Sequence, residues 1–373
     1  SAVEAVLEET RRAGDELEQH VPGAIGPYKI VRYVASGGMG TVYEGLQDEP
    51  RRRVAIKVIR LELLTKESIR RFEDEGHLLA RLRHPGIARV FAMGRTETPA
   101  GAVPYLVLEF IDGEPITTYA KTHELDVPGR IALLRKVCEA VQYAHDNGVM
   151  HRDLKPGNVL VDASGQPHVL DFGIGRTFDD ERNHASLTAS GLFLGTLAYM
   201  SPEQAVRTGT PLDVRVDVYG VGAIGYELLT GQPPQIVKDL PLHKAIERVA
   251  HHEPRALESV DPSLAGDLSA IFTKALSTDP KRRYRSVRDL DHDLRRHLEH
   301  EPVEARPPSR FYQATKLVRR HRTTFALIGL LVLSLIVGLV VSLNQRQAAL
   351  DAKADAVRVA DEATKDRRAA LLS

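Results

Sequence analysis

One uncharged stretch, FALIGLLVLSLIVGLVVSL at residues 325–343, constrains this chain more than any other feature of its sequence. As an α-helix, these nineteen residues would span about 28 Å, close to the thickness of the hydrocarbon core of a bilayer. A core helix of a soluble domain is the alternative, but such helices rarely stay apolar on every face for so long. The stretch lies far from the N-terminus, which excludes a secretory signal peptide. The sequence therefore predicts a single transmembrane helix.

Basic residues are concentrated on the N-terminal side of this stretch: Lys316, Arg319, Arg320 and Arg322. Residues 344–352, on the other side, contain a single basic residue, Arg346. Positive charge next to a transmembrane helix marks its cytoplasmic end. We therefore expect a single-pass protein of the cell (inner) membrane, with the long N-terminal part in the cytoplasm and an extracytoplasmic C-terminus.

The remaining composition is that of a globular protein, with 43% hydrophobic and 27% charged residues, which excludes wholesale disorder. Fifty basic residues balance fifty acidic ones, so no overall basic excess points to a nucleic-acid partner. The single cysteine, Cys138, excludes an intrachain disulfide framework and a multi-cysteine zinc site. We expect five regions: a polar extension at 1–26, a globular domain at 27–300, a basic juxtamembrane linker at 301–324, the membrane helix at 325–343 and a helical extracytoplasmic segment at 344–373, truncated or complete.

A cluster of glycines near the start of the globular domain indicates a phosphate-binding turn. In YKIVRYVASGGMGTVYEG, residues 28–45, apolar residues alternate on both sides of Gly37, Gly38 and Gly40, as in a β-hairpin. Glycines let backbone amides approach phosphate oxygens closely, although a merely flexible turn is the alternative. Lys57 follows at the end of the strand-like run VAIK, where a third strand would bring its ammonium beneath bound phosphates.

Two later motifs, HRDLKPGN at 151–158 and DFG at 171–173, occur in the order and at the separation typical of protein kinases. The chain resembles that family over about residues 28–298. Its motif sequences are most similar to those of the bacterial eukaryotic-like (Hanks-type) Ser/Thr kinases, many of which are receptor-like with one membrane helix. Further matches follow in family order: SPE at 201–203, Asp217 and Arg283. The resemblance implies an α+β, two-lobed kinase fold, with a small, mainly β N-lobe and a larger, mainly α C-lobe.

The resemblance also implies a site for ATP with Mg²⁺, or Mn²⁺ in its place. Lys57 would hold the α- and β-phosphates and be oriented by Glu75 of the following helix. Asp171 and Asn158 would be the metal ligands, because two hard oxygen donors together with phosphate suit Mg²⁺. Phosphoryl transfer depends mainly on positioning and on neutralising charge.

The transfer itself is assigned by resemblance to Asp153, which would align the substrate hydroxyl and accept its proton. Lys155 would neutralise the γ-phosphate and is typical of Ser/Thr rather than Tyr kinases. Asp217 is expected to brace the catalytic loop backbone. Glu203 and Arg283 are expected to form a buried structural ion pair.

The nucleotide cradle departs from the family at one position, because Ala35 stands where the first glycine of the loop is usual. The added methyl group brings the affinity for ATP into question without excluding activity. Adenine would bind the backbone of Glu109 and Ile111, beside Leu108. The residues expected around the nucleotide are therefore Ala35, Gly37, Gly38, Gly40, Val42, Ala55, Lys57, Glu109 and Ile111.

Hydroxyl residues between DFG and SPE indicate regulation by phosphorylation. By resemblance, Thr188 and Ser190 match positions at which related bacterial kinases autophosphorylate, and Arg152 could pair with the added phosphate. Thr196 would instead contact Asp153 and Lys155. A solvated loop with incidental hydroxyls is the alternative. Activation in trans would require a homodimer.

The sequence thus predicts a membrane-anchored kinase that phosphorylates Ser and Thr of protein substrates. A pseudokinase or membrane scaffold is the main alternative, and it would be expected to lack Lys57, Asp153, Asn158 or Asp171; all four are present. A small-molecule phosphotransferase of similar fold would normally lack the DFG-to-SPE segment and Arg283. The expected partners are protein substrates, the lipid bilayer and a second copy of the chain, and not nucleic acid.

Overall fold

The computed structural model describes residues 21–36, 40–59, 66–98, 101–172, 195–206, 212–307, 309, 312–313, 316–317, 320 and 322–371. These residues form two compact units. The first unit includes everything described up to Leu298 together with Val303–Pro307, and the second includes Glu299–Pro302 and the chain after Pro307. The two units are described separately below.

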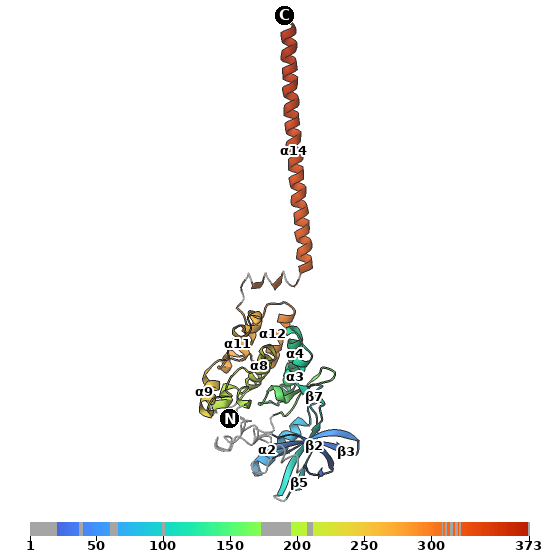
Figure 1. The fold of residues 1–373 in the computed structure, drawn as a ribbon, viewed down its shortest axis with the longest axis vertical. Coiled ribbons are helices and arrows are strands. Elements are labelled where there is room, and N and C mark those ends of the chain that lie inside the picture. The colour runs from blue at the N-terminus through green and yellow to red at the C-terminus, as the bar shows by residue number, and fades with distance from the viewer. Residues whose placement is uncertain are drawn as a thin grey trace. The chain divides into compact units, whose positions relative to one another are not determined.

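The N-terminal lobe of the first unit is an antiparallel sheet in the order β1-β2-β3-β4-β6-β5 (Figure 1). Its strands are β1 (Ala24–Ile25), β2 (Tyr28–Ser36), β3 (Gly40–Gln47), β4 (Arg52–Ile59), β5 (Val90–Thr98) and β6 (Gly101–Glu109). Helix α2 (Lys66–Leu79) packs against β5. Successive side chains of β4 point to opposite faces of the sheet, and both faces are buried. Val54 and Ile56 therefore pack into one cluster of buried side chains and Ile59 into another.

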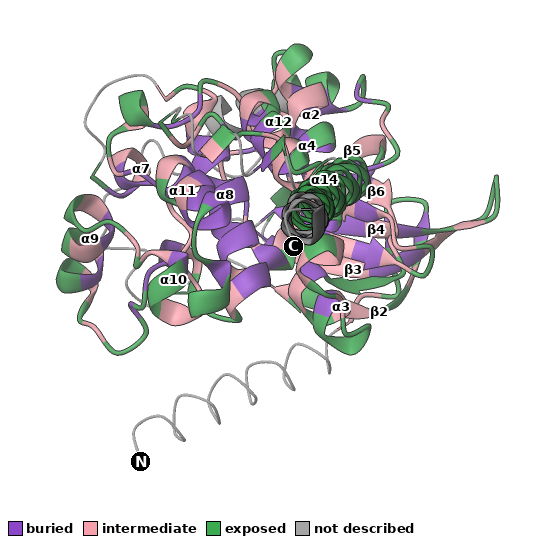
Figure 2. Cartoon of the chain, turned by 90° about the horizontal axis from the view of Figure 1, so that it is seen from above, coloured by how far each residue is buried: buried purple, intermediate pink, exposed green. Residues whose placement is uncertain are grey.

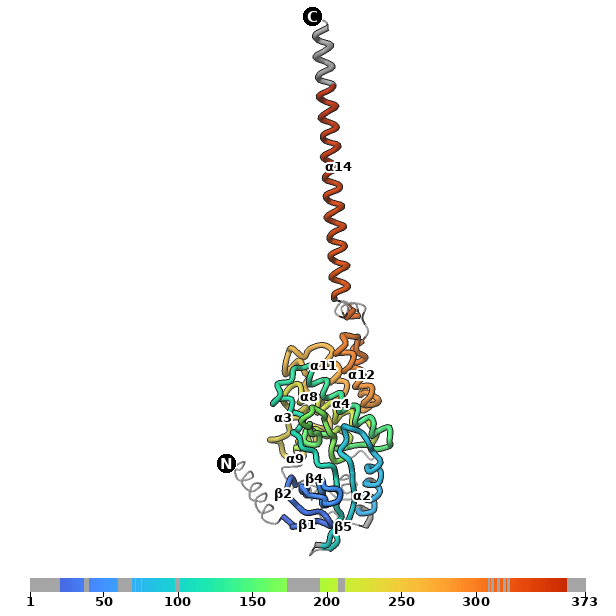
Figure 3. The backbone as a smooth tube through the Cα atoms, turned by 90° about the vertical axis from the view of Figure 1, so that its right-hand side faces the viewer, coloured from blue at the N-terminus to red at the C-terminus, as the bar shows by residue number. Residues whose placement is uncertain are grey.

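After β6 the chain enters a helical lobe, as the tube in Figure 3 shows. A small sheet in the order β7-β8-β9 combines one strand that precedes the first helices of this lobe with two strands that follow them. The strands are β7 (Gly113–Pro115), β8 (Val159–Asp162) and β9 (Pro167–Val169). The helices are α3 (Ile116–Thr122), α4 (Val127–Asp146), α7 (Pro202–Val206), α8 (Arg215–Thr230), α9 (Leu242–His251), α10 (Leu257–Val260), α11 (Asp267–Ala275) and α12 (Val287–Leu298). Short 3₁₀ turns occupy Pro156–Asn158, Pro262–Leu264 and Pro280–Arg282.

Helix α8 is the centre of the helical lobe and is buried on nearly all sides (Figure 2). It packs against α4, α11 and α12. Its glycines allow this close packing: a Cβ on Gly225 would lie 2.5 Å from side-chain atoms of Leu134 and of Phe272. The apolar character of VYGVGAIGY on every face is thus explained by complete burial in this lobe. The two-lobed α+β fold predicted from the sequence is confirmed.

After α12, the chain is clamped to the helical lobe by the buried carboxylate of Asp293, which is 1% exposed. Asp293 accepts hydrogen bonds from the hydroxyl of Tyr284 at 2.8 Å and from the backbone amides of Glu304 at 2.7 Å and Ala305 at 2.9 Å. Arg306 adds an ion pair with Asp267 at 3.2 Å. Because these donors satisfy a buried charge, residues 303–307 are part of the folded domain.

The second unit contains one long helix, α14 (Arg322–Leu371). Within the part of the chain that the structure describes, one helix is long and apolar enough to cross a membrane, and it covers Thr323–Ala360, with a mean hydropathy of 2.9 in its most apolar window. No residue of that window is buried within this chain. The helix continues without a break from the apolar stretch into the Ala-rich, charged segment that follows.

We predict that Asp293→Asn destabilises the first unit by about 1–3 kcal/mol. The side-chain NH₂ group of the asparagine is a donor, and it would face hydroxyl and amide donors that now bond to a carboxylate oxygen. Urea unfolding of the full chain, followed by fluorescence or circular dichroism, measures the change. The control is Asp239→Asn, at an exposed position of the same lobe. An equal loss of stability in the two variants would show that the clamp contributes nothing.

Candidate active site

The loop that contains HRDLKPGN follows α4, and hydrogen bonds to the side chain of Asp217 on α8 fix its backbone. Asp217, 1% exposed, accepts the backbone N–H of His151 and of Arg152, each at 2.7 Å, and contacts Nε2 of His145 at 2.8 Å. Burial alone would raise the pKa of the Asp217 carboxyl, but the bond to His145 and the other donors outweigh burial and lower it. The carboxylate therefore stays ionised and braces the loop backbone, as predicted.

Three predicted catalytic residues of this loop contact one another. Oδ2 of Asp153 lies 3.1 Å from the ammonium of Lys155 and accepts a hydrogen bond of 3.1 Å from the side-chain amide of Asn158. The same amide also donates to the backbone carbonyl of Asp153 at 2.8 Å. Lys155 also donates to the hydroxyl of Thr196 at 3.1 Å, which links the loop to the segment before SPE.

A second pair of predicted residues joins the two lobes. The ammonium of Lys57, on β4, lies 2.9 Å from the carboxylate of Asp171, just after β9. Burial favours the neutral form of Asp171, but the charge and hydrogen bond of Lys57 outweigh it and lower the pKa of that carboxyl. Lys57 itself is only 5% exposed, so its charge needs such a partner.

His151 connects the loop to the DFG segment, and the sequence analysis gave it no role. Its Nε2 donates to the carbonyl of Leu170 at 2.7 Å, and its Nδ1 accepts the backbone N–H of Asp153 at 3.2 Å. Burial lowers the pKa of this imidazole, so it is neutral, and the two bonds require its proton to be on Nε2. Its ring also lies 4.7 Å from the ring of buried Phe172. Its place at the head of the HRD motif is the signal that could have identified it.

Two residues of these motifs have backbone conformations that L-residues rarely adopt. The φ angle is 64° at Arg152 and 55° at Asp171. Such conformations cost about 1–3 kcal/mol each and persist where the surroundings hold them. Here Asp217 fixes the amide of Arg152 and Lys57 holds the side chain of Asp171. The strain thus coincides with the catalytic loop and the predicted metal ligand.

Strand register places the predicted nucleotide-contacting residues side by side on the sheet. Val42 is paired with both Ala35 and Lys57, and Ala55 is paired with Leu108. Ala35 lies in extended strand β2 without a left-handed φ, so an alanine there is not strained. A Cβ on Gly40 would lie 2.1 Å from the carbonyl oxygen of Val58, which explains the glycine at that position.

The segment after β6 that was predicted to bind adenine is fastened to the sheet by Arg53. Arg53 bonds Glu44 of β3 at 2.7 Å and Asp112 at 2.9 Å, and its guanidinium lies over the ring of Phe110 at 4.2 Å. The backbone amide of Glu109 already donates to the carbonyl of Arg89 at 2.8 Å. Any adenine contact by Glu109 would therefore use its carbonyl, leaving the amide role to Ile111, the next predicted position.

Some predicted site residues lie outside the described residues: Gly37, Gly38, Thr188 and Ser190. Glu75 lies on α2, and its side chain is likewise not described. No cluster of three or more His, Cys, Asp or Glu that could hold a metal occurs in the described part of the chain. The donors present, the Asp171 carboxylate and the Asn158 side-chain oxygen, suit Mg²⁺, which takes few protein ligands and completes its shell with phosphate and water.

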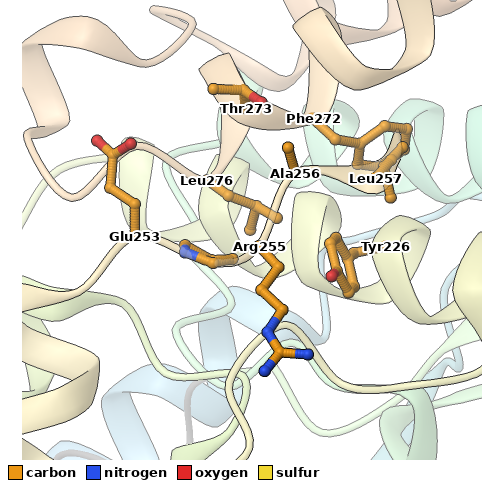
Figure 4. A pocket seen from close by; sticks show the side chains of 9 residues that line it. Tyr226, Glu253, Arg255, Ala256, Leu257, Phe272, Thr273 and Leu276 are labelled. Carbon is orange, nitrogen blue, oxygen red and sulfur yellow. The ribbon is translucent and has the colours of Figure 1, made fainter. Parts of the chain in front are cut away.

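A hollow of about 250 Å³ in the helical lobe is a weaker candidate (Figure 4). It is lined by Tyr226 of α8, by residues 253–257 at and before the start of α10 and by Phe272, Thr273 and Leu276 at and after the end of α11, and by none of the predicted site residues. Figure 4 shows the polar groups of Glu253 and Arg255 pointing in different directions. Because they do not converge, they are poorly arranged to hold a ligand.

Comparison with known proteins agrees with this geometry. The family model for the protein kinase domain matches residues 28–294. The chain belongs to the protein kinase family. The buried ion pair expected in this family is present: the guanidinium of Arg283 makes bonds of 2.7 and 2.8 Å to the carboxylate of Glu203.

Curated relatives are bacterial Ser/Thr kinases. Serine/threonine-protein kinase PknB of Mycobacterium tuberculosis is 37% identical over 280 residues, which are 74% of this chain and 44% of that protein. PknA of the same species is 36% identical over 264 residues, 70% of this chain and 59% of that protein. This chain thus spans about half the length of these relatives. The crystal structure of the M. tuberculosis PknI kinase domain matches with a TM-score of 0.56 and 26% identity, covering 74% of this chain and 98% of that one.

Proposed function

We propose that this protein is a membrane-anchored Ser/Thr kinase that transfers the γ-phosphoryl group of ATP to hydroxyl groups of proteins. The observation that carries the proposal is the contact set of the loop: Asp153 lies against both Lys155 and Asn158, while Lys57 pairs with Asp171. His151 bonds the two motif segments that contain these residues. A scaffold without turnover would not need this set.

In the proposed site, ATP lies under the sheet, with Val42 and Ala55 against the adenine. The carbonyl of Glu109 and the amide of Ile111 would hold its edge. Lys57 would bind the α- and β-phosphates, and Glu75 would orient Lys57. A positive group so deeply buried offers a strong site for phosphate once its carboxylate partner turns to a metal.

Asp171 and Asn158 would hold Mg²⁺ with the phosphates; when bound, the metal neutralises charge on the phosphate oxygens. The amide nitrogen of Asn158 is committed to Asp153, which leaves its side-chain oxygen as the ligand. Asp153 would accept the proton of the substrate hydroxyl. Lys155 would neutralise charge on the γ-phosphoryl group during its transfer. Its hydrogen bond to Thr196 would also connect the loop to the segment before SPE, beside the substrate.

We further propose regulation by phosphorylation of Thr188 or Ser190 in trans by a second copy of the chain. Arg152 supplies the cation that such a phosphate would pair with. Its Nε is buried and has no hydrogen-bond partner among the described residues. An added phosphate in reach of this guanidinium would satisfy both charges.

We also propose that α14 anchors the protein in the inner membrane, with the kinase domain in the cytoplasm and the C-terminus outside. The apolar stretch is exposed, and lipid would cover it. The basic residues before it support this orientation. Anchoring would restrict the enzyme to substrates near the membrane.

We predict that Asp153→Asn lowers phosphate incorporation from labelled ATP at least about 100-fold, because an amide cannot accept the hydroxyl proton. The assay uses the full chain and a generic protein substrate. The control is Asp291→Asn, which removes the charge that pairs with Arg135, well away from the loop. Equal incorporation by wild type and Asp153→Asn would refute the assignment, and none in the wild type would favour the scaffold.

We predict phosphate on Thr188 or Ser190 in active wild-type protein and none in Asp153→Asn. Mass spectrometry of the activation-segment peptide measures it, and mixing the inactive variant with wild type tests transfer in trans. Thr177, in the same segment, serves as an internal comparison. Active protein with neither residue phosphorylated would contradict the proposed regulation.

We predict that the full chain floats with phosphatidylcholine–phosphatidylglycerol vesicles in a density gradient and that deletion of 325–343 abolishes flotation. The matched control removes 349–367, the same length of the same helix beyond the apolar stretch. The control should still float, because its apolar segment is intact. Flotation of the 325–343 deletion, or none of the wild type, would contradict the proposed anchor.

A further inference from the structure

Gln204 joins the segment that contains SPE to the catalytic loop through both ends of its side-chain amide. Its Nε2 donates to the backbone carbonyl of Arg152 at 2.8 Å. Its Oε1 accepts from the hydroxyl of Ser201 at 3.0 Å and from the amide of Ser201 at 3.3 Å. This orientation is chemically required, because a carbonyl can only accept and a backbone amide can only donate.

The bond from Gln204 fixes the peptide group immediately before Asp153. The carbonyl of that peptide is the one that Gln204 holds, and its N–H, which belongs to Asp153, donates to Nδ1 of His151. The preceding peptide is held through the amide of Arg152 by Asp217. Three side chains therefore fix the two peptides around Arg152, which has a φ of 64°.

Gln204 also lies in the wall of a hollow of about 240 Å³ that opens beside the catalytic loop. Asp153, Thr196 and Gly220 line the same hollow. A change in the orientation of the Arg152–Asp153 peptide would turn the Asp153 carboxylate relative to Lys155 and Asn158. Positional errors of about 1 Å at a reacting group can cost about 100-fold in rate.

We infer that Gln204 is a positioning residue for the transfer step: its amide holds the peptide that sets the orientation of Asp153. The inference rests on the proposed function. It adds a residue outside the motifs to those on which turnover depends. Gln204 itself touches neither substrate nor nucleotide in this role; it acts through the backbone of Arg152 and through Ser201.

The most selective test is Gln204→Glu, which keeps an acceptor for Ser201 but removes the donor to Arg152 and places a carboxylate against its carbonyl. We expect kcat to fall about tenfold or more, because one hydrogen bond is lost and two acceptors then face each other. The KM values for ATP and for protein substrate should stay within about twofold of those of the wild type. Lower pH should narrow the difference from wild type, because the protonated carboxyl can again donate. Arg152, Asp153 and Tyr199 also line the hollow and are present in both proteins, so the two proteins are compared at each pH.

The matched control is Gln235→Glu. Gln235 is 2% exposed, and its amide donates to the carbonyl of His252 at 2.6 Å, away from the catalytic loop. This change removes the same kind of bond in the same lobe, so it should lower the melting temperature and leave kcat per folded molecule unchanged. If Gln204→Glu behaves as this control does, Gln204 has a merely structural role and the inference is wrong.

Hydrogen–deuterium exchange of the peptide covering 151–158 gives a readout that does not need catalysis. Exchange should be at least about fivefold faster in Gln204→Glu than in wild type, and unchanged in Gln235→Glu. Unchanged exchange in Gln204→Glu would overturn the inference. If the wild type transfers no phosphate, the proposed function fails, while the exchange comparison still decides whether Gln204 positions the loop.

Discussion

The buried carboxylate of Asp217 is the interaction on which the arrangement of the site depends. A charge 1% exposed inside helix α8, which is buried on nearly all sides, would be very costly without partners. Its partners are the backbone amides of His151 and Arg152 and the imidazole of His145. Satisfying the charge therefore forces the catalytic loop against α8. The absence of a side chain at Gly220 permits the approach, because a Cβ there would lie 2.7 Å from Cβ of Leu154. Core packing and the geometry of the catalytic loop thus have one cause.

Neutral His151 connects this loop to the other half of the site, the segment that contains DFG. Its proton bonds Leu170 and its free nitrogen accepts from Asp153, so the segment before DFG is held in register with the loop. Asp171 then meets Lys57, which belongs to the sheet of the other lobe. Since the largest group of buried side chains also runs from Ile59 and Leu106 in the sheet to α8, the two halves of the site are joined by both packing and charge.

The sequence predicted those parts of the fold and site that depend on short-range pattern or on a family motif. One loop contains Asp153, Lys155 and Asn158, so their proximity could be predicted from their spacing. The length of the apolar stretch likewise predicted a helix. The bonds made by Gln204 and Asp293 could not be predicted in this way. Each joins a side chain to backbone of a distant or irregular segment, and neither hydrophobic period nor composition indicates such a contact. At Ala35, where the family usually has glycine, the structure shows an ordinary strand conformation, so an alanine is not strained there.

The clamp at Asp293 has a consequence for the proposed membrane anchoring. Since Val303–Pro307 are part of the first unit, residues 308–321 separate it from α14, and a chain of that length spans at most about 50 Å when fully extended. Without the clamp, the chain from the end of α12 would add to that reach. Under the proposed anchoring, a short connection would keep the local concentration of membrane-bound substrates, and of a second copy of the kinase, high relative to molecules in solution. The carboxylate that stabilises the end of the domain would thereby also limit which hydroxyl groups the active site meets.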